Sequence, residues 1–308
     1  MQQPLVSVVI PGYNHAPYLR ERIDSVLAQD YPNFEVILLD DRSPDNSAEI
    51  MLGYSEHPRV SHVVINERNS GNTFLQWEKG ISMARGEYVW IAESDDTARP
   101  QFLSRMMESL IAVPEASLAF SRSTMIGPDS RPLGYSWDET WRYKAPGVYA
   151  SRDFCLRRMV FKDLIYNASM VVFRKAFYSK VTTRYQAFRH CGDWLFWFEM
   201  CMLGKVCEVP EELNGFRQHP DKVSNDARSS GKDFEEMAGI QRIMAETLSL
   251  SAYQRRCLRG RQTKRLGKSA IADKERLVGE YPDIYGGTLL DKALYTIDKM
   301  MNISRLQR

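Results

Sequence analysis

The 308-residue sequence lacks the features that mark a secreted, membrane-spanning or nucleic-acid-binding protein. Its five cysteines form neither a C-x-x-C pair nor an even set for disulfides, so we expect reduced thiols and a cytoplasmic setting. No apolar run has the length of a bilayer-spanning helix, and Met1–Pro4 leads directly into a strand-like run rather than a signal peptide. The formal net charge of +2 gives no reason to expect a nucleic-acid partner.

Two signatures of phosphate binding are also absent. No G-x-G-x-x-G follows the first strand-like run, which argues against a dinucleotide-binding Rossmann site, and no GK[ST] phosphate loop occurs. Hydrophobic residues make up 44% of the chain and charged residues 26%, as in an ordinary globular protein. The chain is long enough for one large α/β domain or two smaller ones.

What the sequence does contain is a regular alternation of strand and helix patterns over its first hundred residues. β-Branched apolar runs predict strands over Val6–Ile10, Phe34–Leu39, Val60–Ile65 and Tyr88–Ala92, with helical periodicity over 14–29, 47–55 and 73–84 between them. This alternation predicts a wound, mostly parallel sheet flanked by helices. Further strands are expected near 118–121 and 167–173, and further helices over 194–203, 232–250 and 281–303.

Three carboxylates gather where the fourth predicted strand ends. Tyr88–Ala92 is apolar throughout, as in a strand buried on both faces, and Glu93, Asp95 and Asp96 follow it. Ligands of open α/β sheets bind at this edge, and neighbouring carboxylates repel one another unless a cation offsets their charge. Oxygen ligands suit Mg²⁺ or Mn²⁺. The alternative is that Asp96 only caps a helix beginning near Pro100.

The loops after the other strands should converge on the same edge of the sheet. They contain Pro11–Asn14 after the first strand, Asp40 and Asp41 after the second, and Asn69–Asn72 after the third. In the order in which they occur, these segments resemble the family 2 glycosyltransferases of GT-A fold. The resemblance covers about residues 6–224 and rests on Val6–Asn14, Ser25–Gln29, Leu39–Asp45, Asn69–Gly71 and Gly86–Tyr88.

The resemblance implies a Rossmann-like GT-A fold and transfer of a sugar from a nucleotide diphosphate to an acceptor hydroxyl, with inversion. Pro11 and Tyr13 match the loop that faces the nucleotide base, and Asp41, with Asp40 beside it, matches the acid that accepts from a uracil-type imide. A UDP-sugar donor is therefore expected. Asp45 is expected to cap the following turn or helix. The predicted donor-binding set is Pro11, Tyr13, Asn14, Asp40, Asp41, Asn72, Glu93, Ser94 and Arg217.

The resemblance also implies a metal site. Glu93–Asp95 occupies the D-x-D position of the family, with Asp95 as the metal ligand, although the first acid here is Glu. His219, in a segment that resembles the closing R-x-H…S motif, is the second expected metal ligand, and Arg217 a phosphate partner. A further departure is Gln76–Lys79, where the family often has Ala-Arg-Asn, so the usual arginine is missing.

Asp193 is the predicted general base. It lies in Cys191–Trp197, which matches the family's acid-Asp-Trp helix start, although Gly192 replaces the first acid. The base removes a proton from the acceptor hydroxyl, and a helix start favours the ionised carboxylate. The alternative is that Asp193 is only the N-cap of a helix over 194–203. Aromatic residues that could stack on a sugar, or only anchor a long loop, are Trp137, Trp141 and Tyr143.

The chain is predicted to have a catalytic domain over 1–225 and a helical basic extension over 226–308. Residues 1–120 would bind the nucleotide-sugar and 121–225 the acceptor. Within the extension, residues 255–268 hold seven basic residues and no acid. They form either a solvated helical face or a dock for an anionic membrane surface.

The sequence thus predicts a metal-dependent inverting glycosyltransferase of bacterial-type surface polysaccharide or glycoconjugate synthesis. A glycan or lipid-linked glycan would be its acceptor, at the inner face of the membrane. The family's processive synthases carry a Gln-x-x-Arg-Trp motif, and its absence here favours addition of one sugar or a few. Two alternatives stay open: a catalytically silent module that binds a sugar nucleotide or glycan, and a sugar-nucleotidyltransferase.

Overall fold

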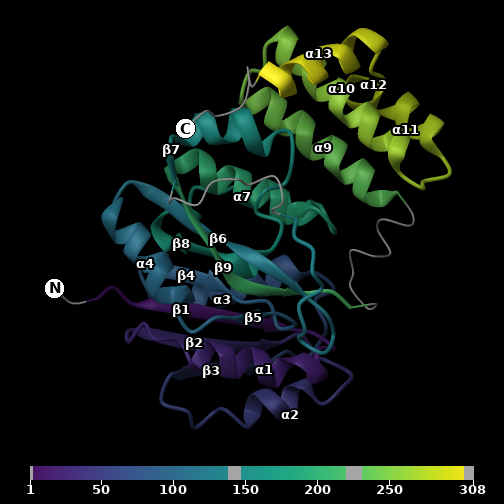
Figure 1. The fold of residues 1–308 in the computed structure, drawn as a ribbon. Helices are drawn as coiled ribbons and strands as arrows, with labels where there is room; N and C mark the ends of the chain where they lie inside the picture. Colours follow the sequence, from purple (N-terminus) through teal and green to yellow (C-terminus); the bar gives the residue numbers. More distant parts are fainter. Residues whose placement is uncertain (1–2, 138–146, 220–230, 302–308) are drawn as a thin grey trace. The chain divides into compact units, whose positions relative to one another are not determined.

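The computed structural model describes residues 3–137, 147–219 and 231–301, which fall into two compact units (Figure 1). The first, here called the sheet unit, comprises Met1–Val148, Asn167–Val181 and Leu203–His219. The second, called the helical unit, comprises Tyr149–Tyr166, Thr182–Met202 and Pro220–Arg308. Residues 149–166 and 182–202 therefore group with the C-terminal part of the chain, so the compact units do not follow the predicted functional boundary after residue 225, which stays a prediction.

A nine-stranded sheet forms the centre of the sheet unit, with the strand order β3-β2-β1-β4-β8-β6-β9-β5 and β7 paired to β9. The first four strands run parallel to one another, β8 is antiparallel to β4 and β6, and β6 is parallel to β9. Its strands are β1 (Val6–Gly12), β2 (Phe34–Asp40), β3 (Val60–Ile65), β4 (Tyr88–Ile91), β5 (Thr97–Ala98), β6 (Ala116–Ile126), β7 (Gly147–Tyr149), β8 (Val171–Arg174) and β9 (Lys205–Arg217).

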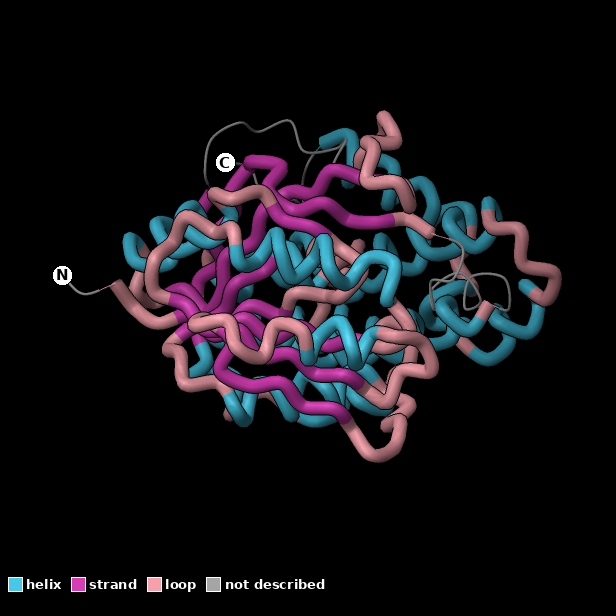
Figure 2. Tube along the Cα trace, turned by 90° about the horizontal axis from the view of Figure 1, so that it is seen from below, coloured by secondary structure: helices cyan, strands magenta, loops and turns pink. Residues whose placement is uncertain are grey.

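Helices cover both faces of this sheet because its strands are apolar on both faces (Figure 2). Val6, Val8 and Ile10 of β1 point to a core shared with α1 (Ala16–Leu27), α2 (Ser47–Leu52) and α4 (Phe102–Ala112). On the other face, α3 (Thr73–Met83) packs so closely that a Cβ on Gly80 would lie 2.2 Å from a methyl carbon of Val9. A short helix, α6 (Lys175–Tyr178), follows β8. The predicted α/β fold is confirmed.

The described residues of the helical unit are mostly helical, with loops between the helices. The most extensive helix packing in this unit is between α10 and α13. A Cβ on Gly260 would lie 2.1 Å from the Asp291 carbonyl oxygen, so only glycine permits this close approach. Ser251 and Gln254 start α10 with a capping box. The helices are α5 (Ser151–Phe154), continued by a π-turn over Cys155–Met159, α7 (Gly192–Leu203), α9 (Lys232–Thr247), α10 (Ala252–Lys268), α11 (Lys274–Glu280), α12 (Pro282–Tyr285) and α13 (Leu289–Met301).

One local prediction and one alternative were wrong. The strand expected over 167–173 begins only at Val171, because Ala168–Met170 form a 3₁₀ turn. Asp96 does not cap the next helix, since α4 begins at Phe102 and the Asp96 carboxylate accepts hydrogen bonds elsewhere. Among the described residues, no helix combines the length and the apolar character that crossing a bilayer requires.

Candidate functional site

The loop after β4, Glu93–Asp96, is here called the acid loop, and each of its carboxyl groups has a different partner. Asp95 Oδ2 lies 3.1 Å from His219 Nε2. Asp96 is fully buried and accepts from the Arg217 backbone N–H at 3.0 Å and from the Asn167 side chain at 2.8 Å. The segment that follows β9 thus meets the end of β4, because both strands end at the same edge of the sheet.

A possible metal-binding group lies at this edge and includes a residue that sequence reasoning missed. One ligand atom each from His15, Asp95 and His219 lies within 4.8 Å of the others. His15 directly precedes α1, and its Nδ1 is 2.8 Å from the Ser94 hydroxyl. A lone histidine after Asn14 carries no spacing signal, so only the fold reveals this neighbour. Two imidazole nitrogens and a carboxylate oxygen form a donor set that suits Mn²⁺.

The two departures from the family pattern contact each other. The Trp77 indole N–H, on α3, donates to Glu93 Oε1 at 2.9 Å. Loss of water contact, and secondly the nearby Asp95 carboxylate, raise the pKa of Glu93 to about 8, while the bond from Trp77 acts against this shift. A carboxyl group that keeps its proton near neutral pH is better suited to a hydroxyl partner than to a cation.

Arg217 holds the acid loop to α1. Its guanidinium is completely buried and donates to the Asp95 carbonyl at 2.6 Å, to Glu21 at 2.7 Å and to the Gly127 carbonyl at 3.0 Å. It also lies over the Tyr18 ring, at 4.8 Å from the centroid. These donors are engaged by the protein, so the bonds give no support to the predicted phosphate contact of Arg217.

The loop after β1 is tied to the loop after β2. Pro11 is buried inside β1, which runs two residues further than predicted, whereas the Tyr13 ring is 48% exposed and open to a stacking partner. Asn14 has a left-handed backbone conformation, with φ of 57°, and its N–H donates to the Ser43 hydroxyl. The N–H and hydroxyl of Ser43 in turn donate to the Asp40 carboxylate. Asp40 is therefore a buried support of this edge.

Asp45 has the predicted capping role in a wider form. It accepts from the N–H of Ser47, which starts α2, and from the N–H of Ala16, which starts α1. One carboxylate therefore fixes the first turns of two helices.

Asp41 is occupied by protein donors. It is buried and accepts from the side chain of Asn66 at 2.7 Å, from the N–H and hydroxyl of Ser70, and from Gln76 at 2.9 Å. Asn72, predicted in the donor-binding set, accepts from the Phe74 N–H and so caps α3. The base contact of Asp41 stays a prediction, and it would compete with these bonds.

The helical unit contains Asp193, the second residue of α7. Because α7 begins at Gly192, the alternative that Asp193 is its N-cap was wrong, although Oδ1 accepts from the Trp194 N–H at 2.9 Å. Burial raises the pKa of Asp193 to about 6, backbone hydrogen bonds act in the opposite direction, and Glu236 adds to the rise.

Two other carboxylates accompany Asp193 in this unit. Glu236 on α9 accepts from the backbone N–H groups of Arg189, His190 and Cys191, and so fixes the loop before α7. Burial, and then the charge of Asp193, raise the pKa of Asp163 well above its usual range. Asp163 is therefore a second acid near the base candidate, whereas Gly192, at the position of the family's other acid, has no carboxyl group. Because Asp163 is distant from Asp193 in the sequence, sequence reasoning did not find it.

The remaining aromatic candidates are only partly described. The Trp137 ring packs edge-on against Phe216, with ring centroids 5.5 Å apart, so this residue anchors the segment after β6. Trp141 and Tyr143 lie outside the described residues, as does the segment 220–224 that follows His219.

The basic segment 255–268 lies on α10 and is largely engaged within the helical unit. Arg256 and Arg259 both bind Asp291 of α13, at 2.7 and 2.9 Å. Four of the other five basic side chains also have partners in the protein, which are a carbonyl, two hydroxyl groups and an aromatic ring. Although burial acts to raise it, the bonds from Arg259 and Arg256 lower the pKa of Asp291. These contacts favour a structural role for the segment over a membrane dock.

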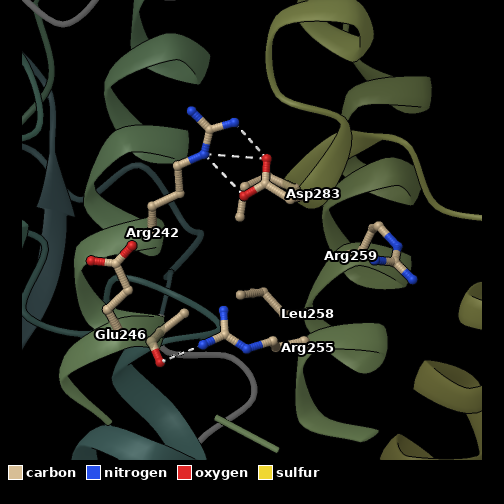
Figure 3. Close-up of a pocket in the computed structure, with 8 residues that line it drawn as sticks. Arg242, Glu246, Arg255, Leu258, Arg259 and Asp283 are labelled. Atoms are coloured by element: carbon tan, nitrogen blue, oxygen red, sulfur yellow. Dashed lines mark hydrogen bonds and ion pairs between the residues drawn. The ribbon is translucent and has the colours of Figure 1, made fainter. Parts of the chain in front are cut away.

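A cavity of about 200 Å³ lies between α9, α10 and α12, and its arginines also favour a structural role (Figure 3). Arg242 on its wall is paired with Asp283, and Arg255 donates to the carbonyls of Leu250 and Ala245. The arginines at this cavity therefore already have acceptors in the protein.

Comparison with known proteins agrees with this geometry. The family model described as "Glycosyl transferase family 2" matches residues 7–164, just over half of the chain. TuaG of Bacillus subtilis, a putative teichuronic acid biosynthesis glycosyltransferase, is 35% identical over 133 residues, which cover 42% of this chain and 51% of TuaG. Glycosyltransferase GlyG of Streptococcus pneumoniae is 38% identical over 107 residues, 34% of this chain and 35% of GlyG. The chain thus matches about half of one relative and a third of the other.

Solved structures resemble the chain over a greater length. Residues 1–349 of Staphylococcus aureus TarS, solved with UDP-GlcNAc, superpose with a TM-score of 0.68 at 16% identity, covering 98% of this chain and 93% of that one. The mannosyltransferase PcManGT of Pyrobaculum calidifontis, solved with GDP-Man and Mn²⁺, gives a TM-score of 0.53 at 16% identity, covering 98% and 81%. Together with the sheet order and the acid loop, the match to the family model shows that the chain belongs to glycosyltransferase family 2.

Proposed function

We propose that this protein is a metal-dependent, inverting glycosyltransferase that transfers a sugar from a UDP-sugar to a hydroxyl group of a cell-surface glycan. The observation that carries the proposal is the group formed by His15, Asp95 and His219 at the carboxyl edge of the sheet. Parallel α/β sheets bind ligands at this edge, and the two imidazoles with one carboxylate offer donors that suit Mn²⁺ better than Mg²⁺.

In this proposal the sheet unit holds the donor. Asp95 and His219, with His15, would hold the ion, whose chemistry when bound is to offset the charge of the leaving diphosphate. Tyr13 provides an exposed ring for the base, and Glu93, with its raised pKa, provides a hydrogen-bond partner for a sugar or ribose hydroxyl. Three other residues support this site structurally. Arg217 bonds to the backbone of the acid loop, Asp40 to Ser43 beside Asn14, and Asn72 caps α3.

The helical unit supplies the base. Asp193 accepts the proton of the acceptor hydroxyl as the oxygen attacks the anomeric carbon, and a single displacement inverts that centre. A pKa near 6 leaves most of the Asp193 carboxyl groups ionised at pH 7 and makes the carboxylate a better proton acceptor than an ordinary aspartate.

The names of similar proteins support the choice of donor and pathway. TuaG is named for teichuronic acid biosynthesis, and the TarS structures contain UDP or UDP-GlcNAc. The PcManGT structure contains Mn²⁺. A lipid-linked glycan acceptor and work at the inner membrane face belong to the proposal, but the pairing of the α10 cations speaks against α10 as the membrane contact.

Calorimetry with D95N tests the proposed metal site. We expect the wild type to bind Mn²⁺ and to bind UDP more tightly when Mn²⁺ is present, and D95N to lose both effects. E78Q, which removes an acid from α3 outside the proposed ligand group, is the matched control and should behave as the wild type. Equal Mn²⁺ affinity of D95N and wild type would refute the metal site.

Two assays separate the alternatives. Slow Mn²⁺-dependent hydrolysis of UDP-GlcNAc by the wild type, absent from D193N, would contradict a silent binding module. Release of pyrophosphate from UTP and a sugar phosphate would instead identify a sugar-nucleotidyltransferase.

A further inference from the structure

The sheet unit contains a buried arginine that the proposed mechanism does not use. Arg22 lies on the inner face of α1 with Leu19, Ile23 and Val26, and none of its surface is exposed. Its guanidinium carbon lies 4.9 Å from the centroid of the Trp90 ring. Trp90 belongs to β4, and three residues after it the acid loop begins. The charge is therefore held in the core, under the strand that leads to the candidate metal site.

The three nitrogen atoms of this guanidinium have no hydrogen-bond partner among the described residues. Buried arginines usually direct their donors to acceptors, as Arg217 does in the same unit. Arg22 therefore interacts with its surroundings through its stacking on Trp90 and through its charge, and not through a hydrogen bond to a described residue. A role in fixing the backbone of the acid loop belongs to Arg217 instead.

The charges that Arg22 faces are those of the acid loop. Burial lowers the pKa of Arg22 to about 10, while Asp96 and Asp95, and Glu93 when it is ionised, act to raise it and Arg217 acts to lower it. Arg22 therefore remains positively charged at neutral pH. Tyr18 and Glu21, also on α1, contact Arg217, whose guanidinium is bonded to the Asp95 carbonyl, so this part of α1 is linked to the acid loop through Arg217.

We propose that Arg22 is a positioning residue that places a fixed positive charge beneath the acid loop and sets the balance between its affinity for a divalent cation and its affinity for a diphosphate. A fixed positive charge weakens the binding of a cation and strengthens the binding of an anion at the same site. It also reduces the mutual repulsion of the carboxylates before any ligand arrives. This inference rests on the proposed function, because it assumes a metal and diphosphate site at the acid loop.

R22M tests the inference because methionine keeps an unbranched side chain against Trp90 and removes the charge. We expect R22M to bind Mn²⁺ at least roughly tenfold more tightly and to bind UDP, at saturating Mn²⁺, roughly tenfold more weakly, because the removed charge repels the cation and attracts the diphosphate. A purely structural role would weaken both affinities together. Isothermal titration with Mn²⁺ alone, and then with UDP, measures both.

Two further variants make the test decisive. R20M removes the same charge from the exposed side of α1 and should leave both affinities within about twofold, because exposed charges are screened. R22K keeps the charge and should retain both wild-type affinities. If R22M does not fold, R22K still decides, because opposite shifts or joint losses in R22K would show that the charge is not what matters.

The outcomes also separate this inference from the proposed function. A wild type that binds neither Mn²⁺ nor UDP refutes the proposed function and the inference with it. A wild type that binds both, with R22M behaving like R20M, refutes only the role of Arg22.

Discussion

The two units of the protein each contain a group of carboxylates, and the groups have opposite surroundings. In the sheet unit, the acid loop contacts cationic or cation-forming side chains, with Arg217 bonded to its backbone and His219 beside Asp95. In the helical unit, the side chain that acts on Asp193 is another carboxyl group, Glu236, and Asp193 in turn raises the pKa of Asp163. In the first group Asp95 and Asp96 are bonded to donor groups, whereas Glu93, removed from water beside them, holds its proton more tightly. In the second group the base candidate itself, Asp193, does so.

This difference shows how one residue type supports two kinds of chemistry. Charge balanced by arginines is suited to a permanent ion-binding site. Charge confined with like charge and cut off from water gives a carboxylate that accepts a proton near neutral pH. For Asp163, the nearby cations Lys162 and Arg265 offset only part of this effect. The predictions below test this contrast, from the largest expected effect to the smallest.

The largest effect is expected from D193N. Asparagine cannot accept the proton of the acceptor hydroxyl, so sugar transfer should fall by about 10²–10⁴-fold. Binding of UDP and Mn²⁺, measured by calorimetry, should stay at wild-type values because the donor is held by the sheet unit. E275Q, on an exposed part of α11, serves as the control. Normal turnover in D193N would remove Asp193 from the mechanism.

D291A should cause the largest loss of stability. Asp291 is fully buried and binds Arg256 and Arg259, so its removal leaves two guanidinium groups without their acceptor. Because water can reach both guanidinium groups in part, we expect the free energy of unfolding to fall by about 1.5–3 kcal/mol. Urea unfolding measures this.

D283A is the matched comparison for D291A because its ion pair with Arg242 is half exposed, and it should cost only about 0.5–1 kcal/mol. Equal losses in the two variants would show that burial of the pair does not matter.

D193N should also stabilise the protein at alkaline pH. The folded-state pKa of Asp193 is raised to about 6, above that of an unfolded aspartate, so its favourable contribution is complete below about pH 4 and is lost as pH rises through 6. At pH 8 the variant should therefore be more stable than the wild type by about 1–3 kcal/mol, and at pH 4 the difference should vanish. Urea unfolding at the two pH values checks the sign.

D96N provides the contrast in the sheet unit. Asp96 accepts from the Arg217 N–H and from Asn167, so the substitution should destabilise the protein at both pH values. A stabilising effect of D96N at pH 8 would contradict the difference between the two groups.

The smallest effect is expected from W77F. Phenylalanine keeps a ring in the α3 core and removes the N–H that donates to Glu93, so the free energy of unfolding should fall by about 1 kcal/mol. If Glu93 contacts the donor sugar, the KM ratio between UDP-GlcNAc and UDP-Glc should change in W77F. F74L, in the same helix but without a bond to Glu93, should leave that ratio unchanged.

Much of the fold could be predicted because its signals are local. The four parallel strands and their helices follow from runs such as Tyr88–Ala92, whose apolar character needs no long-range information. The acid loop was recognised for the same reason. Asp45 was also predicted to cap, and it caps, because its spacing to Ser47 is short.

The side-chain partners could not be predicted because they come from distant segments. His15 and Arg22 reach the acid loop only when α1 packs against β4, and Asp163 reaches Asp193 only when two separate segments fold together. Conversely, Asn72 matches a loop expected at the nucleotide, yet its side chain caps α3. A motif gives the position of a residue along the chain but not the donors that surround it.

The glycine at position 80 has a consequence for both departures from the family pattern. It is the point at which α3 touches Val9, and any larger side chain there would push the whole helix outward. Because α3 also carries Gln76 to Asp41 and Trp77 to Glu93, that outward shift would loosen both contacts at once. The absence of a single methyl group at this point of the core thus keeps both the loop with Asp41 and the acid loop bonded to α3.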